Sequence, residues 1–180
     1  MRCKANALLE INHCAAQREY VDWKYRELAN LVATPPHERD GNGTRRAYRF
    51  TTRSLPQLMP FFRAFYPEGR KVVPAVSLSP LTLAVWFMDD GSRSYNTAYL
   101  NTQQFTADEQ SALLGMLEAQ WAIKGYVNKD KRYLRIRLSV ESAVRFVEIV
   151  RPLLLPEFEY KLPGRFRSTL RFESRKGAMP

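Results

Sequence analysis

Residues 83–91 form an apolar segment that ends in two acidic residues and a glycine, Asp89, Asp90 and Gly91. The apolar residues recur at helical spacing and also fill the remaining positions, which predicts a helix buried on nearly all sides: Leu83, Ala84, Val85, Trp86, Phe87 and Met88. Carboxylates at the C-terminal end of a helix meet the negative end of its dipole, at a cost of up to about 1 kcal/mol. A divalent cation would offset that cost. Because Asp-Gly also commonly ends a solvent-exposed helix, the rest of the chain has to decide between the two interpretations.

The net charge is the second constraint on function. With 28 Lys and Arg against 18 Asp and Glu, the 180 residues carry a charge of +10. A chain this basic usually binds a polyanion, and nucleic acid is the favoured partner. A membrane is not expected, because the sequence has neither a basic amphipathic helix nor the ~20 consecutive apolar residues that span a bilayer.

Cysteine and histidine are scarce: Cys3, Cys14, His13 and His37. They define neither a disulfide framework nor a histidine-based metal site. The scarcity of cysteine predicts a reducing, intracellular compartment, and the sequence does not distinguish an organelle, such as a mitochondrion or chloroplast, from the bacterial cytoplasm.

The chain contains an internal repeat. In the second half we expect a strand at 97–104, a helix at 107–123, strands at 125–129 and 132–139, and a helix at 140–150. In the first half we expect a strand at 7–13, a helix at 16–32, a turn-rich loop at 34–44, a strand at 47–52 and a helix at 55–65. Each half closes on a lysine shortly followed by proline, Lys71 with Pro74 and Lys161 with Pro163. The repeat predicts halves at 1–76 and 77–163, and a basic tail at 164–180.

The last strand of each half carries basic residues. In the second half, apolar Leu134, Ile136 and Leu138 alternate with Tyr133, Arg135 and Arg137, so one face meets a core and the other presents an aromatic ring and two guanidinium groups. Arginines also occupy the matching region of the first half: Arg46, Arg49 and Arg53. An ordinary solvated face is the alternative. The repetition favours a paired basic surface, a saddle formed by both sheets.

Aligning the halves predicts a missing element. Gly91 lies shortly before the strand residue Ala98, which corresponds to Ala7, so the matching acid-tipped helix of the first half would end at or just before Met1. Three interpretations stay open: a truncated reading frame, which we favour, a decayed gene, or self-association of two copies through the helix at 83–90. Without a partner helix, Leu83, Trp86 and Phe87 would expose a large apolar face.

These features resemble the LAGLIDADG homing endonucleases of the single-chain, two-half type. Residues 83–91 have the length of the nine-residue family motif and match it at Leu83, Ala84, Asp90 and Gly91. The likeness runs from about residue 7 to 163 and includes further segments in both halves: 20–24, 35–37, 71–74, 100–103, 151–156 and 160–163. The resemblance is specific because several features occur in the family's order. These are the nine-residue motif, the strand that follows it, the lysine near the end of each half and the repeat of the two halves.

The resemblance implies an α+β fold of two pseudo-symmetric αββαββα halves. Each half contributes a four-stranded antiparallel sheet to the saddle, and the first half lacks its N-terminal motif helix. It implies that the protein is an intron-type homing endonuclease or a truncated remnant of one. Such an enzyme makes a metal-dependent double-strand cut at a long specific DNA site. A non-cutting nucleic-acid binder on the same fold is the alternative, such as an RNA maturase that binds intron RNA and assists splicing. Asp90 favours the nuclease, because a pure binder does not require that carboxylate.

The resemblance also implies roles for residues at matching positions, inside and outside the nine-residue motif. Asp90 matches the acid that binds Mg²⁺, for which Mn²⁺ is the expected substitute, and the backbone carbonyl of Asp89 is the second expected metal ligand. Lys71 and Lys161 match basic residues near the scissile phosphates, and Gln103 matches a position close to the metal-bound waters. The expected DNA-contacting residues are Arg46, Arg49, Arg53, Arg93, Asn101, Gln103, Tyr133, Arg135 and Arg137.

Overall fold

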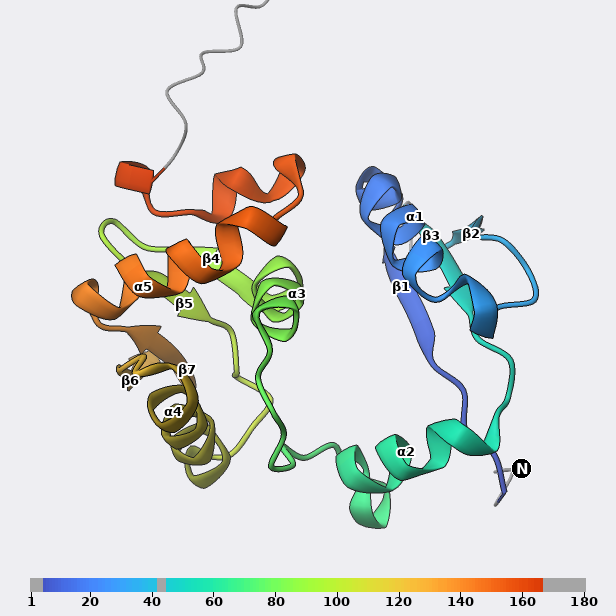
Figure 1. The fold of residues 1–180 in the computed structure, drawn as a ribbon, viewed down its shortest axis with the longest axis horizontal. Helices are drawn as coiled ribbons and strands as arrows, with labels where there is room; N and C mark the ends of the chain where they lie inside the picture. The colour runs from blue at the N-terminus through green and yellow to red at the C-terminus, as the bar shows by residue number, and fades with distance from the viewer. Residues whose placement is uncertain (1–4, 42–44, 167–180) are drawn as a thin grey trace, which may run out of the picture. The chain divides into compact units, whose positions relative to one another are not determined.

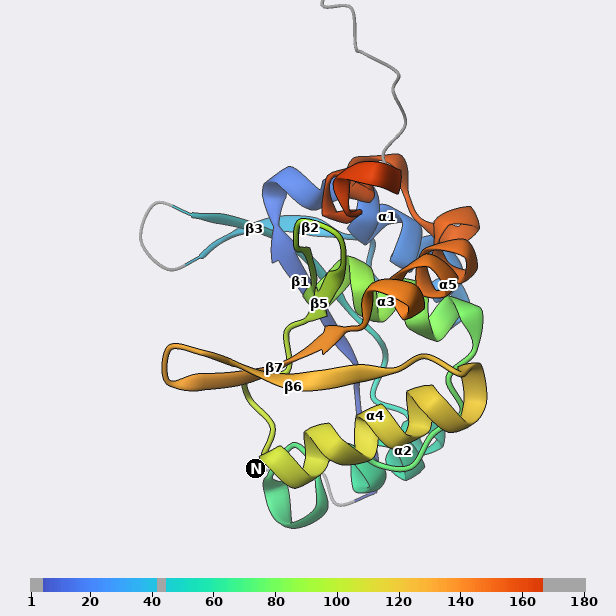
Figure 2. The same cartoon turned by 90° about the vertical axis from the view of Figure 1, so that its left-hand side faces the viewer.

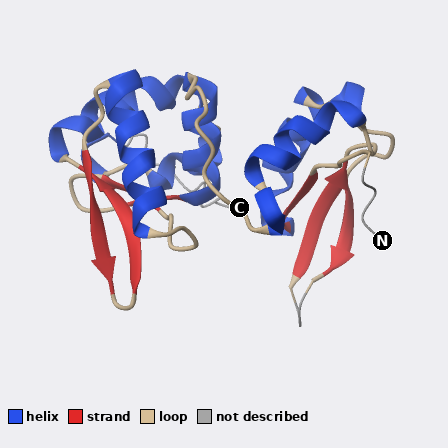
Figure 3. Ribbon diagram, turned by 90° about the horizontal axis from the view of Figure 1, so that it is seen from below, coloured by secondary structure: helices blue, strands red, loops and turns tan. Residues whose placement is uncertain are grey.

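The computed structural model describes residues 5–41 and 45–166, and it divides the chain into two compact units, Met1–Pro74 and Ala75–Pro180 (Figure 1). Each unit combines an antiparallel sheet with helices that lie on one side of its strands (Figure 3). None of the helices within these residues is long and apolar enough to cross a membrane.

Unit 2 contains a complete αββαββα series. Its elements are α3 (Pro80–Asp90), β4 (Gly91–Arg93), β5 (Ala98–Leu100), α4 (Ala107–Trp121), β6 (Gly125–Asp130), β7 (Tyr133–Leu138) and α5 (Val140–Val150). The four strands form an antiparallel sheet in the order β4-β5-β7-β6, and the β6–β7 hairpin stands out in Figure 2. Alternation along β7 buries Ile136 and Leu138 on the helix-covered face, as the sequence predicts.

Unit 1 contains the last five elements of the same series. They are β1 (Glu10–Cys14), α1 (Arg18–Glu27), β2 (His37–Asp40), β3 (Arg46–Thr51) and α2 (Met59–Phe65). The sheet order β1-β3-β2 corresponds to β5-β7-β6 of unit 2, which confirms the internal repeat. Val21 of α1 packs on Tyr48 and Phe50 of β3 to form the core of this unit. The expected fourth strand does not occur among the described residues of unit 1.

Several element boundaries differ from the sequence prediction. The helix expected at 16–32 is regular only over Arg18–Glu27 and continues as a separate 3-10 turn, Ala29–Leu31. The segment expected to be a loop at 34–44 contains β2, and β4 was not predicted at all. Both strands are short, and β2 is exposed along its whole length, so neither has the alternating apolar pattern that identifies a strand.

The strand expected at 97–104 ends at Leu100 because a buried glutamine organises the following residues. The Gln110 amide donates to the carbonyls of Thr102, Phe105 and Leu134, and its oxygen accepts from the Thr102 hydroxyl at 3.0 Å. These bonds satisfy the backbone in place of a sheet ladder. A capping box begins α4, with reciprocal bonds between Thr106 and Glu109.

Candidate metal centre and nucleic-acid interface

Helix α3 carries the acidic pair on a buried support. Four of its side chains are fully buried: Leu83, Ala84, Phe87 and Met88. The Phe87 ring meets Phe146 of α5 edge-on, with a centroid distance of 5.3 Å. The expectation that Leu83 and Phe87 form a large exposed apolar face is therefore wrong, since α3 packs against α5 of its own unit. Asp89 and Asp90 are exposed at the end of the helix.

Gly91 joins α3 to β4 because a larger residue does not fit. Its backbone is extended (φ −80°, ψ 151°) and not left-handed, so the requirement for glycine is not conformational. A Cβ at this position would lie 2.1 Å from Cδ2 of Phe87 and 2.4 Å from the Phe87 carbonyl oxygen. The close approach lets the chain pass from helix to strand without a loop, which fixes the acidic pair at the sheet edge.

Lys161 occupies the C-terminal end of α3. Its buried Nζ donates to the backbone carbonyls of Met88 at 2.5 Å, Asp89 at 3.3 Å and Phe87 at 3.4 Å. Burial lowers the pKa of the Lys161 ammonium, and the charges of Asp89 and Asp90 act in the opposite direction. A positive charge at a helix C-terminus stabilises the dipole. The ammonium group thus offsets the cost of the two carboxylates, the role that the sequence alone suggested for a metal ion.

The geometry of the helix end decides which groups could hold a metal. The carbonyl of Asp90 accepts from the backbone N–H of Asn101 at 2.8 Å, and the carbonyl of Asp89 accepts from Lys161. A cation on the Asp89 carbonyl would therefore face an ammonium group, which disfavours the predicted carbonyl ligand. The exposed carboxylates fit a hard, partly hydrated divalent ion better. No cluster of three or more His, Cys, Asp or Glu suited to a metal occurs among residues 5–41 and 45–166.

The helix-free face of the unit 2 sheet is basic and aromatic. Cross-strand pairing places Tyr99 and Tyr126 on either side of Arg137. The Arg135 guanidinium lies over the Tyr99 ring at 3.8 Å and donates to Asn101 Oδ1 at 3.4 Å. Tyr133, two residues before Arg135 in β7, has the same orientation. This face therefore carries four of the predicted DNA-contacting residues: Asn101, Tyr133, Arg135 and Arg137. Two tyrosines that were not predicted, Tyr99 and Tyr126, lie on the same face.

Arg93 does not belong to this face. It pairs with the buried Ala98 across β4 and β5, so the two residues point to the opposite side of the sheet from Arg137. Gln103 is exposed in the turn after β5, outside the strands. The prediction that Arg93 acts with the sheet-face arginines is not supported by this register.

The three predicted arginines of unit 1 are also separated. Arg49 lies on the helix-free face, while Arg46 has the orientation of buried Tyr48 and forms an ion pair with Glu38 at 3.0 Å. Arg53 follows the strand and donates to the Asn30 carbonyl at 2.7 Å. The register also places Asn12, His37 and Arg39 on the helix-free face. Arg39 was not among the predicted DNA-contacting residues, because the sequence at β2 has the composition of a loop.

Comparison with known proteins decides the family. Residues 2–146 match the model of the LAGLIDADG DNA endonuclease family. The chain belongs to this family. It is 31% identical over 160 residues to the cytochrome b mRNA maturase bI2 of Debaryomyces hansenii, covering 82% of this chain and 61% of the maturase. It is 32% identical over 181 residues to protein RecA of Mycobacterium gastri, covering 89% of this chain and 42% of that protein. The chain thus spans only about two to three fifths of these relatives.

A solved structure shares the LAGLIDADG fold. The homing endonuclease I-WcaI bound to its DNA recognition sequence superimposes with a TM-score of 0.78 at 24% identity, covering 90% of this chain and 78% of that chain. At this identity the likeness establishes the fold, and it confirms the α+β architecture expected from the sequence.

Lys71, the second lysine with a predicted catalytic role, belongs to unit 1. It is exposed and lies beside an apolar pocket that Leu8, Phe61, Phe62 and Tyr66 also line. Asp90 and Lys161 belong to unit 2. The structure therefore joins Lys161 to the motif helix, while the catalytic role expected for Lys71 remains a prediction.

Proposed function

We propose that this protein is a homing endonuclease that cuts both strands of a long, specific DNA site in the presence of Mg²⁺. The observation that carries the proposal is the position of Asp90: the buried helix α3 holds it at the edge of a basic, aromatic sheet face. A binding protein would need the sheet face alone, whereas the acid-tipped buried helix adds a group suited to hydrolysis. The related I-WcaI is a homing endonuclease that binds its DNA recognition sequence.

In this proposal the Asp90 and Asp89 carboxylates hold the metal ion. When bound, the ion would supply an activated water and neutralise charge on the phosphate. Asp90 stays in place because α3 is packed on α5 and because Gly91 leads directly into β4. Lys161 acts as a positioning residue, since its ammonium group is occupied by three carbonyls of the same helix end.

DNA binding would use the helix-free face of each sheet. In unit 2, the exposed Arg137 and Tyr133 present guanidinium and phenol groups that suit base edges and phosphates in the major groove. Arg135 lies beside them, paired with Asp130 at 3.1 Å. In unit 1, Arg49 and Arg39 hold comparable places on β3 and β2. A two-stranded or larger sheet surface can enter the major groove, so this face is suited to duplex DNA.

The test starts from a randomised duplex library, because the target sequence has to be found first. Duplexes that bind the protein in EDTA are enriched, sequenced and then incubated with Mg²⁺ or Mn²⁺. We expect both strands to be cut at a fixed position. Asp90→Asn should keep the affinity for the duplex but lower the cleavage rate about a hundredfold or more, since even second-shell changes at metal sites cost up to that factor.

Asp108→Asn is the matched control, because Asp108 is an exposed acid in the first turn of α4 of the same unit. It should cut like the wild-type protein. Unchanged cleavage by Asp90→Asn would contradict the proposed role of the motif acid.

The second candidate function is that of an RNA maturase, and the 31% identity to the cytochrome b mRNA maturase bI2 favours it. A maturase would bind intron RNA and promote its splicing without needing the Asp90 carboxylate. The maturase alternative would be established over the nuclease by two results together. Asp90→Asn would support splicing as well as the wild-type protein does, and neither protein would cleave any enriched duplex.

A further inference from the structure

The hairpin loop between β4 and β5 forms one wall of a pocket on unit 2. A backbone bond from Ser94 N to the Thr97 carbonyl (2.7 Å) closes the loop, and the Thr97 hydroxyl anchors it to the Leu138 carbonyl at 2.8 Å. The loop is thereby held in one shape and projects the side chains between these two residues, Tyr95 and Asn96. The opposite wall is the 3-10 turn Gly164–Phe166.

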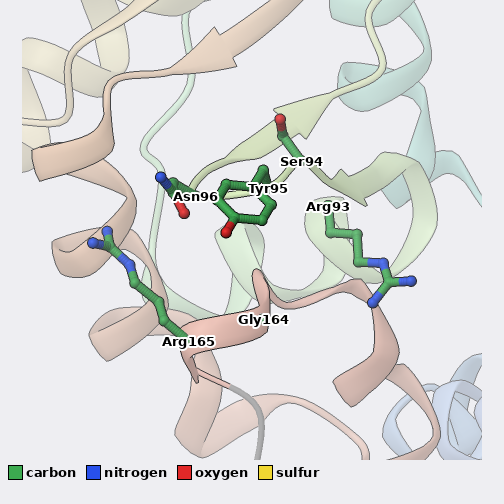
Figure 4. A pocket seen from close by; sticks show the side chains of 6 residues that line it. All are labelled: Arg93, Ser94, Tyr95, Asn96, Gly164 and Arg165. Atoms are coloured by element: carbon green, nitrogen blue, oxygen red, sulfur yellow. The ribbon is translucent and has the colours of Figure 1, made fainter.

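The pocket has a volume of about 570 Å³ and six lining residues: Arg93, Ser94, Tyr95, Asn96, Gly164 and Arg165. A space of this size accommodates a small ligand or a nucleotide. In the view of Figure 4, the Tyr95 ring stands between the side chains of Arg93 and Arg165, above Gly164. The lining includes two guanidinium groups and no carboxylate, so the pocket favours an anion.

Tyr95 is the most unusual member of this group. Its side chain is 88% exposed, although tyrosine normally buries much of its ring. Arg93 is likewise exposed and has no ion-pair partner within the described part of the chain. Arg165 donates one N–H to the Val140 carbonyl at 2.9 Å, which orients the guanidinium group and leaves its other donors available.

The pocket is separate from the proposed duplex-binding face. Arg93 points to the opposite side of the sheet from Arg137, as the β4–β5 register shows. Most of the predicted basic tail, residues 167–180, lies outside the described residues. Within the pocket, an aromatic ring lies between two guanidinium groups, an arrangement that suits a base with a phosphate on either side better than a single small ion.

We propose that this pocket binds a single-stranded nucleic-acid segment. One unpaired base stacks on the Tyr95 ring, the Asn96 amide contacts an edge of that base, and Arg93 and Arg165 contact the phosphates on either side. A base can stack on an exposed ring only when it is unpaired, which distinguishes this ligand from duplex DNA. The ligand is an unpaired nucleotide with flanking phosphates, a chemistry that single-stranded RNA and single-stranded DNA share.

The experiment measures the anisotropy of fluorescent oligonucleotides of about 10 nucleotides, a length in the range of known single-strand sites. Single-stranded RNA, single-stranded DNA and a matched duplex are titrated with the full-length protein. We expect Tyr95→Leu to weaken single-strand binding about tenfold, as loss of one stacked base does, and to leave duplex binding within about twofold. Tyr95→Phe retains the ring and should bind like the wild-type protein. A stronger effect on RNA or on DNA identifies the natural source of the strand.

Two further variants separate stacking from general charge. Tyr160→Leu removes another exposed tyrosine of unit 2, 53% accessible and outside both the sheet and the pocket lining, and should leave single-strand affinity unchanged. The double variant Arg93→Gln and Arg165→Gln should lower the slope of log affinity against log salt by about 1.4, because each single-strand phosphate contact contributes about 0.7. Equal effects of Tyr95→Leu and Tyr160→Leu, or an unchanged salt slope in the double variant, would overturn the proposal. Neither outcome bears on cleavage at Asp90.

Discussion

At the scale of single residues, Lys161 changes the interpretation of the motif. Two carboxylates at a helix C-terminus are unfavourable in isolation, and the sequence pointed to a metal ion as the compensating charge. The structure supplies that charge internally, from a buried ammonium group bonded to the last carbonyls of α3. The acidic pair can therefore persist without metal, which lets the helix end be preformed before any ion binds.

The contribution of Lys161 to stability can be measured directly. Lys161→Met keeps most of the apolar stem but removes three charge-assisted hydrogen bonds, so we expect the free energy of unfolding to fall by about 2–3 kcal/mol in urea titrations. Lys124→Met is the control, because Lys124 forms an exposed ion pair with Glu118 at 3.6 Å and should cost less than about 1 kcal/mol. Equal losses in both variants would contradict the helix-end role of Lys161.

At the scale of elements, the direct passage from α3 into β4 fixes the acidic pair. The sequence identified the helix, the acids and the glycine, and one of its two interpretations was the common helix end at which glycine follows the last turn. The structure shows that the glycine is needed for space, because Phe87 lies where a Cβ would be. Spacing patterns report which residues share a helix, whereas a backbone contact between a helix and the strand after it depends on tertiary packing.

This steric role gives a paired prediction for two glycines of unit 2. Gly91→Ala forces a methyl group into the Phe87 ring and carbonyl, so we expect a loss of stability of at least about 2 kcal/mol, together with weaker cleavage. Gly115→Ala lies inside α4, where an added Cβ meets nothing within 4 Å, and should stabilise by about 1 kcal/mol. Thermal and urea unfolding of both variants would test this, and the hypothesis fails if the two substitutions change stability in the same direction.

At the scale of the whole molecule, the repeat was readable from the sequence and the sheet faces were not. The order of helices and strands follows from apolar periodicity and capping signals, and the expected limits of α5 agree with the structure. The side of a sheet on which an arginine lies depends on where its strand begins and how it pairs. A shift of the pairing by one residue moves every side chain of the strand to the other face. Arg46 and Arg49 lie three positions apart in one strand and therefore face opposite ways. Arg93 was misplaced for a related reason, since β4 was not recognised as a strand.

The corrected faces predict which arginines take part in duplex binding. If both helix-free faces contact DNA phosphates, Arg137→Gln and Arg49→Gln should each reduce the slope of log affinity against log salt by about 0.9, the contribution of one phosphate contact in B-DNA. Arg46→Gln and Arg93→Gln should leave that slope unchanged, because their side chains point to the helix-covered sides of the sheets. Titrations of an enriched duplex at several salt concentrations would measure all four slopes. A response to Arg137→Gln but not to Arg49→Gln would confine DNA binding to unit 2, and a response to Arg93→Gln would mean that the duplex extends beyond the sheet face.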